Sequence, residues 1–385
     1  MPNTLTNLIP TLYESLDIVS RELVGFIPSV SRDSNIERAA IGQTVYSFVA
    51  PAVTAGDITP AVIPPDDGQQ IIGNISLAIT KAKRVPVRWQ GEESLQMNNG
   101  GPGVSNIRRD QFTQAMRTLV NLIEADLAAL YAGGSRAIVP ASTSLFSASL
   151  ADSANVLKIL QDNGAPLSEL KMVIDTTSGA ALRTLAQLNK ANEAGDDTLL
   201  RQGVLLDVHG FQIRESAQVG SITKGTAAGA TTNATGYAIG STTITLASAG
   251  TGTLLAGDVI SFAGDTNQYV LVSGDTSTAD GGTIVLAAPG LRQAIPAAAT
   301  AITVRATGTR AMAFARSAII LATRMPALPE GGDMAADRTT ITDPRSGLSF
   351  EVAMYKQYRQ IQYEISVAWG VKAVKAEHIA LMCGA

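Results

Sequence analysis

The sequence predicts an α+β fold into which a small all-β module is inserted. Helical and strand-like patterns both occur along most of the chain, which predicts one mixed host core. The window Ala217–Arg305 differs, because it has only 7 charged residues in 89 positions, less than half the density elsewhere, and 13 of the 35 glycines. It also lacks helical periodicity, so the chain on its two sides is expected to complete the host core together.

Length and composition limit the interpretation. A chain of 385 residues predicts two or three domains, and 45% hydrophobic residues are enough for a large core. The charged fraction of 16% is well below the usual quarter. Such a surface is typical of a protein covered by its neighbours, and equally of a Gly- and Ala-rich soluble enzyme.

Charge and cysteine content exclude several classes of protein. The formal net charge of -4 argues against a sequence-independent nucleic-acid binder, which needs a basic surplus. No apolar run reaches membrane-spanning length, and the N-terminus lacks the basic leader of a secretory signal, so we expect synthesis in a cytoplasm. The single cysteine, Cys383, excludes an intrachain disulfide framework and disfavours a cysteine-based metal site.

The N-terminal part is predicted to be a helix and arm followed by a hairpin. Apolar spacing predicts a helix over Thr6–Val24, and the remainder of residues 1–42 is expected to be an extended arm. In residues 43–104 two strand-like runs, QTVYSFVAP and NISLAITKAKRVPVRW, flank a segment rich in Pro, Gly and Asp. This pattern predicts a long hairpin.

The return strand of that hairpin is basic, with Lys81, Lys83, Arg84 and Arg88. One interpretation is a solvated edge that uses charge to avoid unwanted strand pairing. The other is a contact with a neighbouring subunit, because a long hairpin cannot bury itself. The sequence leaves both open.

Residues 105–134 contain the strongest helical pattern. Apolar residues fall at spacings of three and four, and Gly133 with Gly134 ends the helix. About 27 residues give a rod of roughly 40 Å, which is long for a globular helix. Residues 135–216 are predicted to form a compact α+β unit with a helix closed by Gly164, a buried strand LKMVID and a second helix.

Short apolar runs separated by Gly- and Asp-containing turns predict a small β-barrel or sandwich in residues 217–305. Residues 306–385 again show the pattern of the predicted host core. Their last part, TTITDPRSGLSFEVAMYKQYRQIQYEISVAWGVKAVK, alternates strongly and predicts long antiparallel strands.

The glycine-rich stretch AGTGTLLAGDVISFAGDTNQYVLVSGD fits no ligand motif. Gly250 and Gly252 give G-x-G, but Leu255 occupies the third position of the dinucleotide fingerprint, and no phosphate-binding Gly-Lys-Ser/Thr follows. The aspartates of this window lack calcium-loop spacing and lie beside glycines, which predicts turn formation. We nominate no cofactor and no metal ligand there.

Catalytic candidates are equally scarce. The two histidines, His209 and His378, lie at a predicted turn and near the C-terminus, and neither accompanies a nucleophile motif. No pair of carboxylates is held in a context that suits general acid–base chemistry. We therefore nominate no catalytic residue and expect a protein that is not an enzyme.

Three stretches, in this order, resemble the major capsid (coat) proteins of tailed double-stranded DNA bacteriophages, which share the Hong Kong-type (Johnson) fold: GVLLDVHGFQIRES, AFARSAIILATRMPALP and DPRSGLSFEVAMYKQYRQIQYEISVAWGVKAVKAE. In that family the first is similar to a strand pair, the second to a helix-like segment and the third to closing strands ending in WGVK. The opening NTLTNLIPTLYESLDIVSRELVGFIPSV is more similar to the coat proteins of short-tailed Salmonella-type phages, which carry an inserted telokin-like β-barrel.

The resemblance implies a division of the chain that covers nearly all of it. Residues 1–42 correspond to the N-terminal helix and arm, 43–104 to the extended loop with a peripheral strand, and 105–134 to the spine helix. Residues 135–216 and part of 306–385 correspond to the axial domain, and the last strands to the peripheral domain. Residues 217–305 correspond to the inserted barrel, which the family places on the outside of the shell.

The resemblance also implies a function. The chain would assemble with itself into hexamers and pentamers of an icosahedral shell, with a scaffolding protein and a portal protein as partners. The shell would enclose double-stranded DNA without sequence-specific binding and expand on packaging. The implied location is the virion capsid, assembled in the cytoplasm of the host bacterium, with no membrane involved.

Some relatives cross-link their shell covalently by joining a loop lysine to an asparagine of a neighbouring subunit. This chain has Lys81 and Lys83 but no asparagine after Asn267, which implies a non-covalent shell. We expect the basic residues of the hairpin strand to contact a neighbour. The alternative is another virion structural protein, such as a decoration or tail subunit, that uses the β module for binding.

Overall fold

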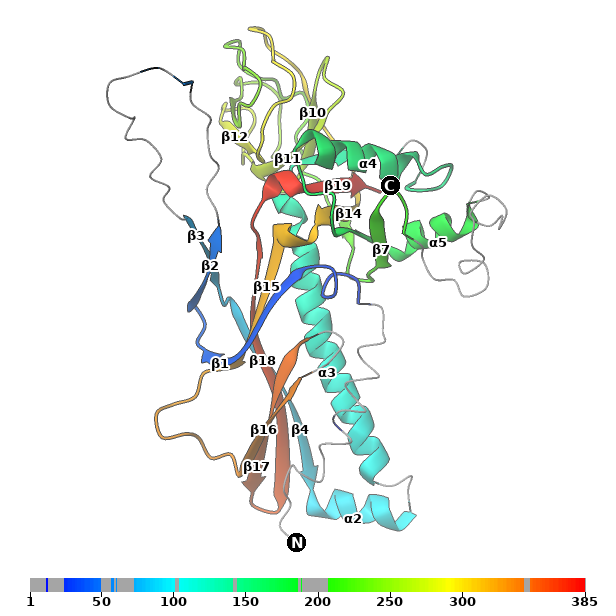
Figure 1. Ribbon diagram of the computed structural model, residues 1–385, viewed down its shortest axis with the longest axis vertical. Helices are drawn as coiled ribbons and strands as arrows, with labels where there is room; N and C mark the ends of the chain where they lie inside the picture. Colours follow the sequence, from blue (N-terminus) through cyan, green and yellow to red (C-terminus); the bar gives the residue numbers. More distant parts are fainter. Residues whose placement is uncertain are drawn as a thin grey trace.

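The computed structural model describes residues 12, 24–49, 57–58, 60, 73–100, 104–140, 144–185, 188, 207–342 and 347–384. The predicted N-terminal helix and most of the excursion between the hairpin strands lie outside these residues. The described strands form two large sheets and one two-stranded sheet, with a long helix beside them, so the α+β class is confirmed (Figure 1).

Six strands form what we call the lower sheet. It contains β1 (Ser31–Ala39), β15 (Ile319–Pro326), β18 (Gln360–Ala373), β17 (Ser349–Gln357) and β16 (Asp337–Thr342) in this order, and β4 (Lys81–Gln90) lies along the other side of β18. All neighbouring pairs are antiparallel except β1 with β15. The long antiparallel strands predicted near the C-terminus are confirmed.

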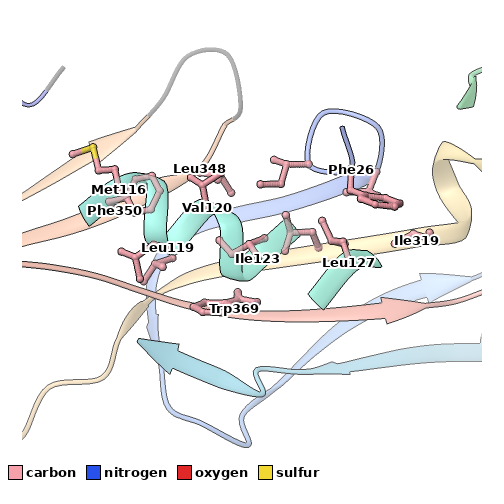
Figure 2. Packing of buried hydrophobic residues seen from close by; sticks show 14 of the residues in the cluster. Phe26, Met116, Leu119, Val120, Ile123, Leu127, Ile319, Leu348, Phe350 and Trp369 are labelled. Carbon is pink, nitrogen blue, oxygen red and sulfur yellow. The ribbon is translucent and has the colours of Figure 1, made fainter. Parts of the chain in front are cut away.

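Helix α3 (Val104–Ala128) runs along the lower sheet from the upper part of the molecule to the short helix α2 (Gly91–Gly100) (Figure 1). It continues into the 3-10 turn η2 (Ala129–Gly133), which agrees closely with the predicted long helix. Five apolar positions at the predicted three- and four-residue spacing are fully buried: Phe112, Met116, Leu119, Ile123 and Leu127. Figure 2 shows Met116, Leu119, Ile123 and Leu127 packed among residues of the arm segment and the lower sheet, which are Phe26, Ile319, Phe350 and Trp369.

Glu124 of α3 adds polar contacts to this apolar packing. Glu124 is buried and accepts hydrogen bonds from the backbone N–H groups of Phe26 at 3.1 Å and Ile27 at 2.8 Å. The hydroxyl of Ser216 donates to the same carboxylate at 3.0 Å. Burial raises the pKa of the Glu124 carboxyl, although these three donors act in the opposite direction. Glu124 thus joins three segments that are distant in the sequence.

A second group of strands forms the upper sheet, with β5 (Arg136–Ile138), β19 (Ile379–Cys383), β14 (Gly308–Ala315), β6 (Leu170–Ile174) and β7 (Phe211–Glu215) in this order. Helices α4 (Ala151–Asp162) and α5 (Thr176–Thr184) belong to this part. Gly164 follows α4 with a φ of +72°, which confirms the predicted end of that helix.

The stretch AFARSAIILATRMPALP corrects one expectation. The resemblance implied a helix-like segment, but the structure has two strands, β14 and β15, joined by the 3-10 turn of Arg316–Ala318. Both strands are buried on both faces over most of their length. Such strands read as continuous apolar runs without a period of two, so periodicity does not separate them from a buried helix.

Residues 221–304 contain short strands with an apolar core of their own. In hydrogen-bonded order these are β9 (Thr243–Thr245), β12 (Thr283–Leu286), β11 (Gln268–Ser273), β10 (Val259–Phe262) and β13 (Ile302–Val304). Residues 230–233 connect the two ends of this series. Thr232 donates its N–H to the carbonyl of Thr300, and Asn233 donates to that of Thr245.

This module is not a separate sheet, because β11 also pairs with β5 of the host. Arg136 of β5 is buried at the junction and donates to Asn267 of the module at 3.0 Å. The same guanidinium donates to Ile159 and Asn163 at the end of α4. The strand pairing and this arginine fix the module against α4. That the module is an inserted telokin-like domain stays a prediction.

We predict that Glu124→Ala lowers the free energy of unfolding by about 2–3 kcal/mol, because it leaves the buried N–H groups of Phe26 and Ile27 without an acceptor. Urea unfolding followed by circular dichroism measures the effect. The matched control is Glu330→Ala, whose carboxylate is exposed. Equal unfolding midpoints for both variants would show that the Glu124 hydrogen bonds do not hold the arm segment.

Candidate functional site

Strand β4 carries the four basic residues that the sequence singled out. Its odd-numbered positions from Val85 onward face α3: Val87 and Trp89 are buried, and the Trp89 indole N–H donates to Gln111 at 2.7 Å. The positions between them are exposed. The strand therefore presents a face of polar and charged side chains away from α3.

The location of these residues corrects the hairpin prediction. The hairpin consists of β2 (Thr44–Val49) and β3 (Gly73–Ala78), which form a two-stranded sheet of their own. The chain then crosses at Ile79 and Thr80, and β4 pairs with β18 in the lower sheet. The four basic residues thus lie beside the hairpin root and not on the hairpin.

The four basic residues divide into two pairs. Lys81 forms an ion pair with Asp126 of α3 at 2.6 Å, and Arg84 forms one with Glu364 of β18 at 2.6 Å. Lys83 and Arg88 are exposed, and neither has an ion-pair partner among the described residues. Lys83 and Arg88 are therefore the two that remain available to another molecule.

The outer edge of β4 is poorly suited to strand addition. No described strand pairs with that edge, yet Pro86 lies in its middle and lacks a backbone N–H donor. Proline and charge on an edge strand are common protection against unwanted pairing. A contact at this edge would use side chains and not a backbone ladder.

The hairpin root depends on a glycine in the WGVK stretch. Thr80 donates its N–H to the carbonyl of Trp369 at 3.1 Å, and Ile79 is fully buried. A Cβ on Gly370 would lie 2.1 Å from the carbonyl oxygen of Ala78. Only glycine lets the hairpin root cross β18 this closely.

Trp369, the residue before that glycine, is hydrogen-bonded to α3. Its indole N–H donates to Asp126 at 2.8 Å, and the other oxygen of the same carboxylate accepts from Lys81 at 2.6 Å. The sequence analysis did not identify Asp126 or Glu124. The available signal was a carboxylate directly beside an apolar position of the helix, next to Leu127 in one case and Ile123 in the other.

One serine and one histidine lie close enough to be considered as a nucleophile and its general base. Ser153 Oγ lies 2.8 Å from His209 Nδ1, at the turn predicted for this histidine. The Ser153 hydroxyl donates to the carbonyl of Leu150. With its single proton used there, the contact with His209 has the histidine Nδ1–H as donor. A general base has to accept the proton of its nucleophile, which this arrangement does not allow. The pair ties the 207–211 turn to α4.

The remaining reactive side chains are those of the partly buried His378 and the buried Cys383. Burial lowers the pKa of His378 and raises that of the Cys383 thiol, which keeps both groups neutral. Among the described residues no group of three or more His, Cys, Asp or Glu side chains could hold a metal ion. No helix in the described part of the chain is long and apolar enough to span a bilayer.

The aspartates of the glycine-rich stretch act as turn formers, as predicted. The Asp258 carboxylate accepts the N–H groups of Leu255 and Gly225. Asp265 accepts the hydroxyl of Tyr269 at 2.6 Å, and burial together with this hydrogen bond raises the pKa of Tyr269 to about 12. Asp275 accepts the N–H of Ser277 through one oxygen, while its other oxygen is buried and has no partner among the described residues.

Comparison with known proteins gives structural likeness without sequence likeness. No protein-family model and no curated protein matches the chain. Similar solved structures include one of Mycobacterium phage Che8, with 13% identity, coverage of 89% of this chain and 84% of that chain, and a TM-score of 0.47. The capsid of cyanophage P-SCSP1u has 12% identity, coverages of 95% and 89%, and a TM-score of 0.49. The mature capsid of bacteriophage PhiM1 has 11% identity, coverages of 93% and 86%, and a TM-score of 0.45.

We predict that Gly370→Ala displaces the hairpin root and lowers the free energy of unfolding by about 2 kcal/mol, because the new methyl group overlaps a backbone oxygen. Hydrogen exchange at the Thr80 amide should accelerate together with this loss. Gly220→Ala is the matched control, since a Cβ there meets nothing within 4 Å. Unchanged exchange at Thr80 would contradict the role given to Gly370.

Proposed function

We propose that the chain is the major capsid protein of a tailed double-stranded DNA bacteriophage, which assembles with copies of itself into a closed icosahedral shell. The proposal combines the sequence resemblance with the surfaces that one chain leaves uncovered. It includes the Hong Kong-type fold, in which α3 is the spine helix, the lower sheet the peripheral domain and the upper sheet the axial domain.

The observation that carries the proposal is the set of surfaces that the described part of the chain leaves uncovered. No described strand pairs with the outer edge of β4. On the same strand, Lys83 and Arg88 are exposed and have no ion-pair partner among the described residues. A neighbouring copy can cover this edge through side-chain contacts.

The hairpin supports the same conclusion. Strands β2 and β3 pair only with each other among the described residues, and Tyr46 on β2 is 62% exposed. An isolated two-stranded ribbon is marginally stable in water, so a neighbouring surface is needed to cover it. A hairpin of one copy that lies on the next copy is a head-to-tail contact, the type from which rings and closed shells are built.

Finer parts of the proposal follow from the resemblance. We propose hexamers and pentamers, a scaffolding protein and a portal protein as partners, and enclosed DNA bound without sequence specificity. The acidic net charge of -4 suits a shell that encloses DNA without binding it tightly. We also propose a non-covalent shell in the virion, assembled in the host cytoplasm, and a telokin-like barrel in residues 217–305 that projects outward.

The test is to produce the full chain in bacteria with its scaffolding protein and to examine the product by negative-stain electron microscopy. Closed shells support the proposal. Rods or small soluble oligomers alone would contradict it and favour another virion component, such as a decoration or tail subunit.

Within that assay we predict that Lys83→Glu combined with Arg88→Glu prevents shell formation while the chain still folds. Both side chains are exposed and take part in no ion pair of the described residues, so the reversal should affect contacts between copies. Lys158→Glu, at an exposed position of α4, is the control. Normal shells from the double variant, with an unchanged unfolding midpoint, would remove β4 from the interface.

A further inference from the structure

A groove at the end of the lower sheet is the most distinctive unused feature of the surface. It lies between α2, the beginning of α3 and the turn that joins β17 to β18, and its volume is about 700 Å³. The side chains that matter for the argument are Trp89, Arg108, Lys356, Arg359, Gln360 and Tyr363. Three separate parts of the chain contribute them.

The groove is cationic. Arg108, Lys356 and Arg359 line it, and no Asp or Glu is among its described lining residues. None of the three cations has an ion-pair partner among the described residues. In a chain with a net charge of -4, three uncompensated cations in one groove favour an anionic ligand.

Arg108 is positioned for such a ligand. Its guanidinium carbon lies 5.9 Å from the ring centroid of Trp89 and 5.6 Å from that of Tyr363. These two rings orient the guanidinium plane. Its Nε atom is buried and has no acceptor in the described part of the chain. An unsatisfied buried donor beside a groove calls for an acceptor from outside.

The turn beside Arg108 is also held in a restricted conformation. Arg359 has a φ of +54°, in the left-handed region that favours glycine, and its carbonyl accepts the N–H of Gly91 at 3.2 Å. Its neighbour Tyr358 is 89% exposed. Strained residues that are kept in place by surrounding contacts concentrate at binding sites.

We propose that this groove binds the loop Ala327–Ala336 of a second copy of the chain, an inference that rests on the proposed self-assembly. The loop joins β15 to β16, contains Glu330 and Asp333, and has no basic residue. Its Met334 is 89% exposed. The Glu330 carboxylate supplies the anion for the three cations of the groove.

Within this loop the two carboxylates have different roles. Asp333 accepts from the Tyr355 hydroxyl at 2.7 Å and forms an ion pair with Arg338, so it fixes the loop to its own sheet. Glu330 is exposed and has no partner among the described residues. The pair Gly331–Gly332, both at positive φ, separates these two carboxylates. Glu330 is therefore the carboxylate that can reach a neighbour.

The arrangement of the strands agrees with a contact between copies. The loop leads into β16, at one end of the lower sheet, whereas the groove includes β4 on the other side of β18. Complementary surfaces on different sides of one subunit give a head-to-tail contact, which can close into a ring. A phosphate backbone would need a longer stripe of positive charge than three cations in one groove.

The first test titrates the full-length protein into a fluorescently labelled peptide with the sequence of residues 327–336 and measures anisotropy at low salt. We expect saturable binding that weakens at least about tenfold with Arg359→Glu, the effect of losing one charge-assisted contact. Lys158→Glu is the control for net charge, and a peptide with Glu330→Gln is the control for the carboxylate. Absent binding, equal binding of both peptides, or binding of a DNA oligonucleotide in place of the peptide would overturn the proposal.

The second test exchanges the charges in the assembling protein. Arg359→Glu alone and Glu330→Arg alone should each reduce the yield of shells, and the combined variant should recover it. Shells that form normally with Arg359→Glu would overturn the inference and leave the proposed function intact. If the unmodified chain itself forms no shells, the proposed function fails, and the peptide titration still decides whether the groove binds the loop sequence.

Discussion

The packing of α3 against the lower sheet is the constraint on which the rest of the structure depends. Its apolar side is buried over about four turns. The carboxylates of Glu124 and Asp126 bind segments from four other parts of the chain. Glu124 holds the segment that leads into β1, while Asp126 holds Trp369 and Lys81. Because these contacts use opposite sides of one rigid helix, the helix sets the spacing between the arm segment and the hairpin root.

The upper and lower sheets are coupled by three crossings of the chain. The turn η2 leads from α3 into β5, the Arg316–Ala318 turn leads from β14 into β15, and β18 continues through a short turn into β19. The module of residues 221–304 is attached to the upper sheet through β11 and Arg136. Strand β5, which follows α3 and its 3-10 turn, is therefore the element that joins the helix to the module.

Four features that one chain leaves uncovered lie along the lower sheet. They are the hairpin, the edge of β4, the cationic groove and the acidic loop, and each lacks a covering element among the described residues. In the proposed shell these four features would take part in contacts between copies.

The sequence by itself determined the elements whose pattern is local: the long helix, the alternating C-terminal strands, the turn-forming aspartates and the low-charge window. Only the tertiary structure decided that β14 and β15 are strands, since residues buried on both faces leave no period to detect. The sequence also did not predict that the return strand divides into β3 and β4 at Ile79 and Thr80. A β pattern does not specify which strand it pairs with. The groove could not be predicted from the sequence, because residues 89, 108 and 356–363 come together only when the sheet and α3 pack against each other.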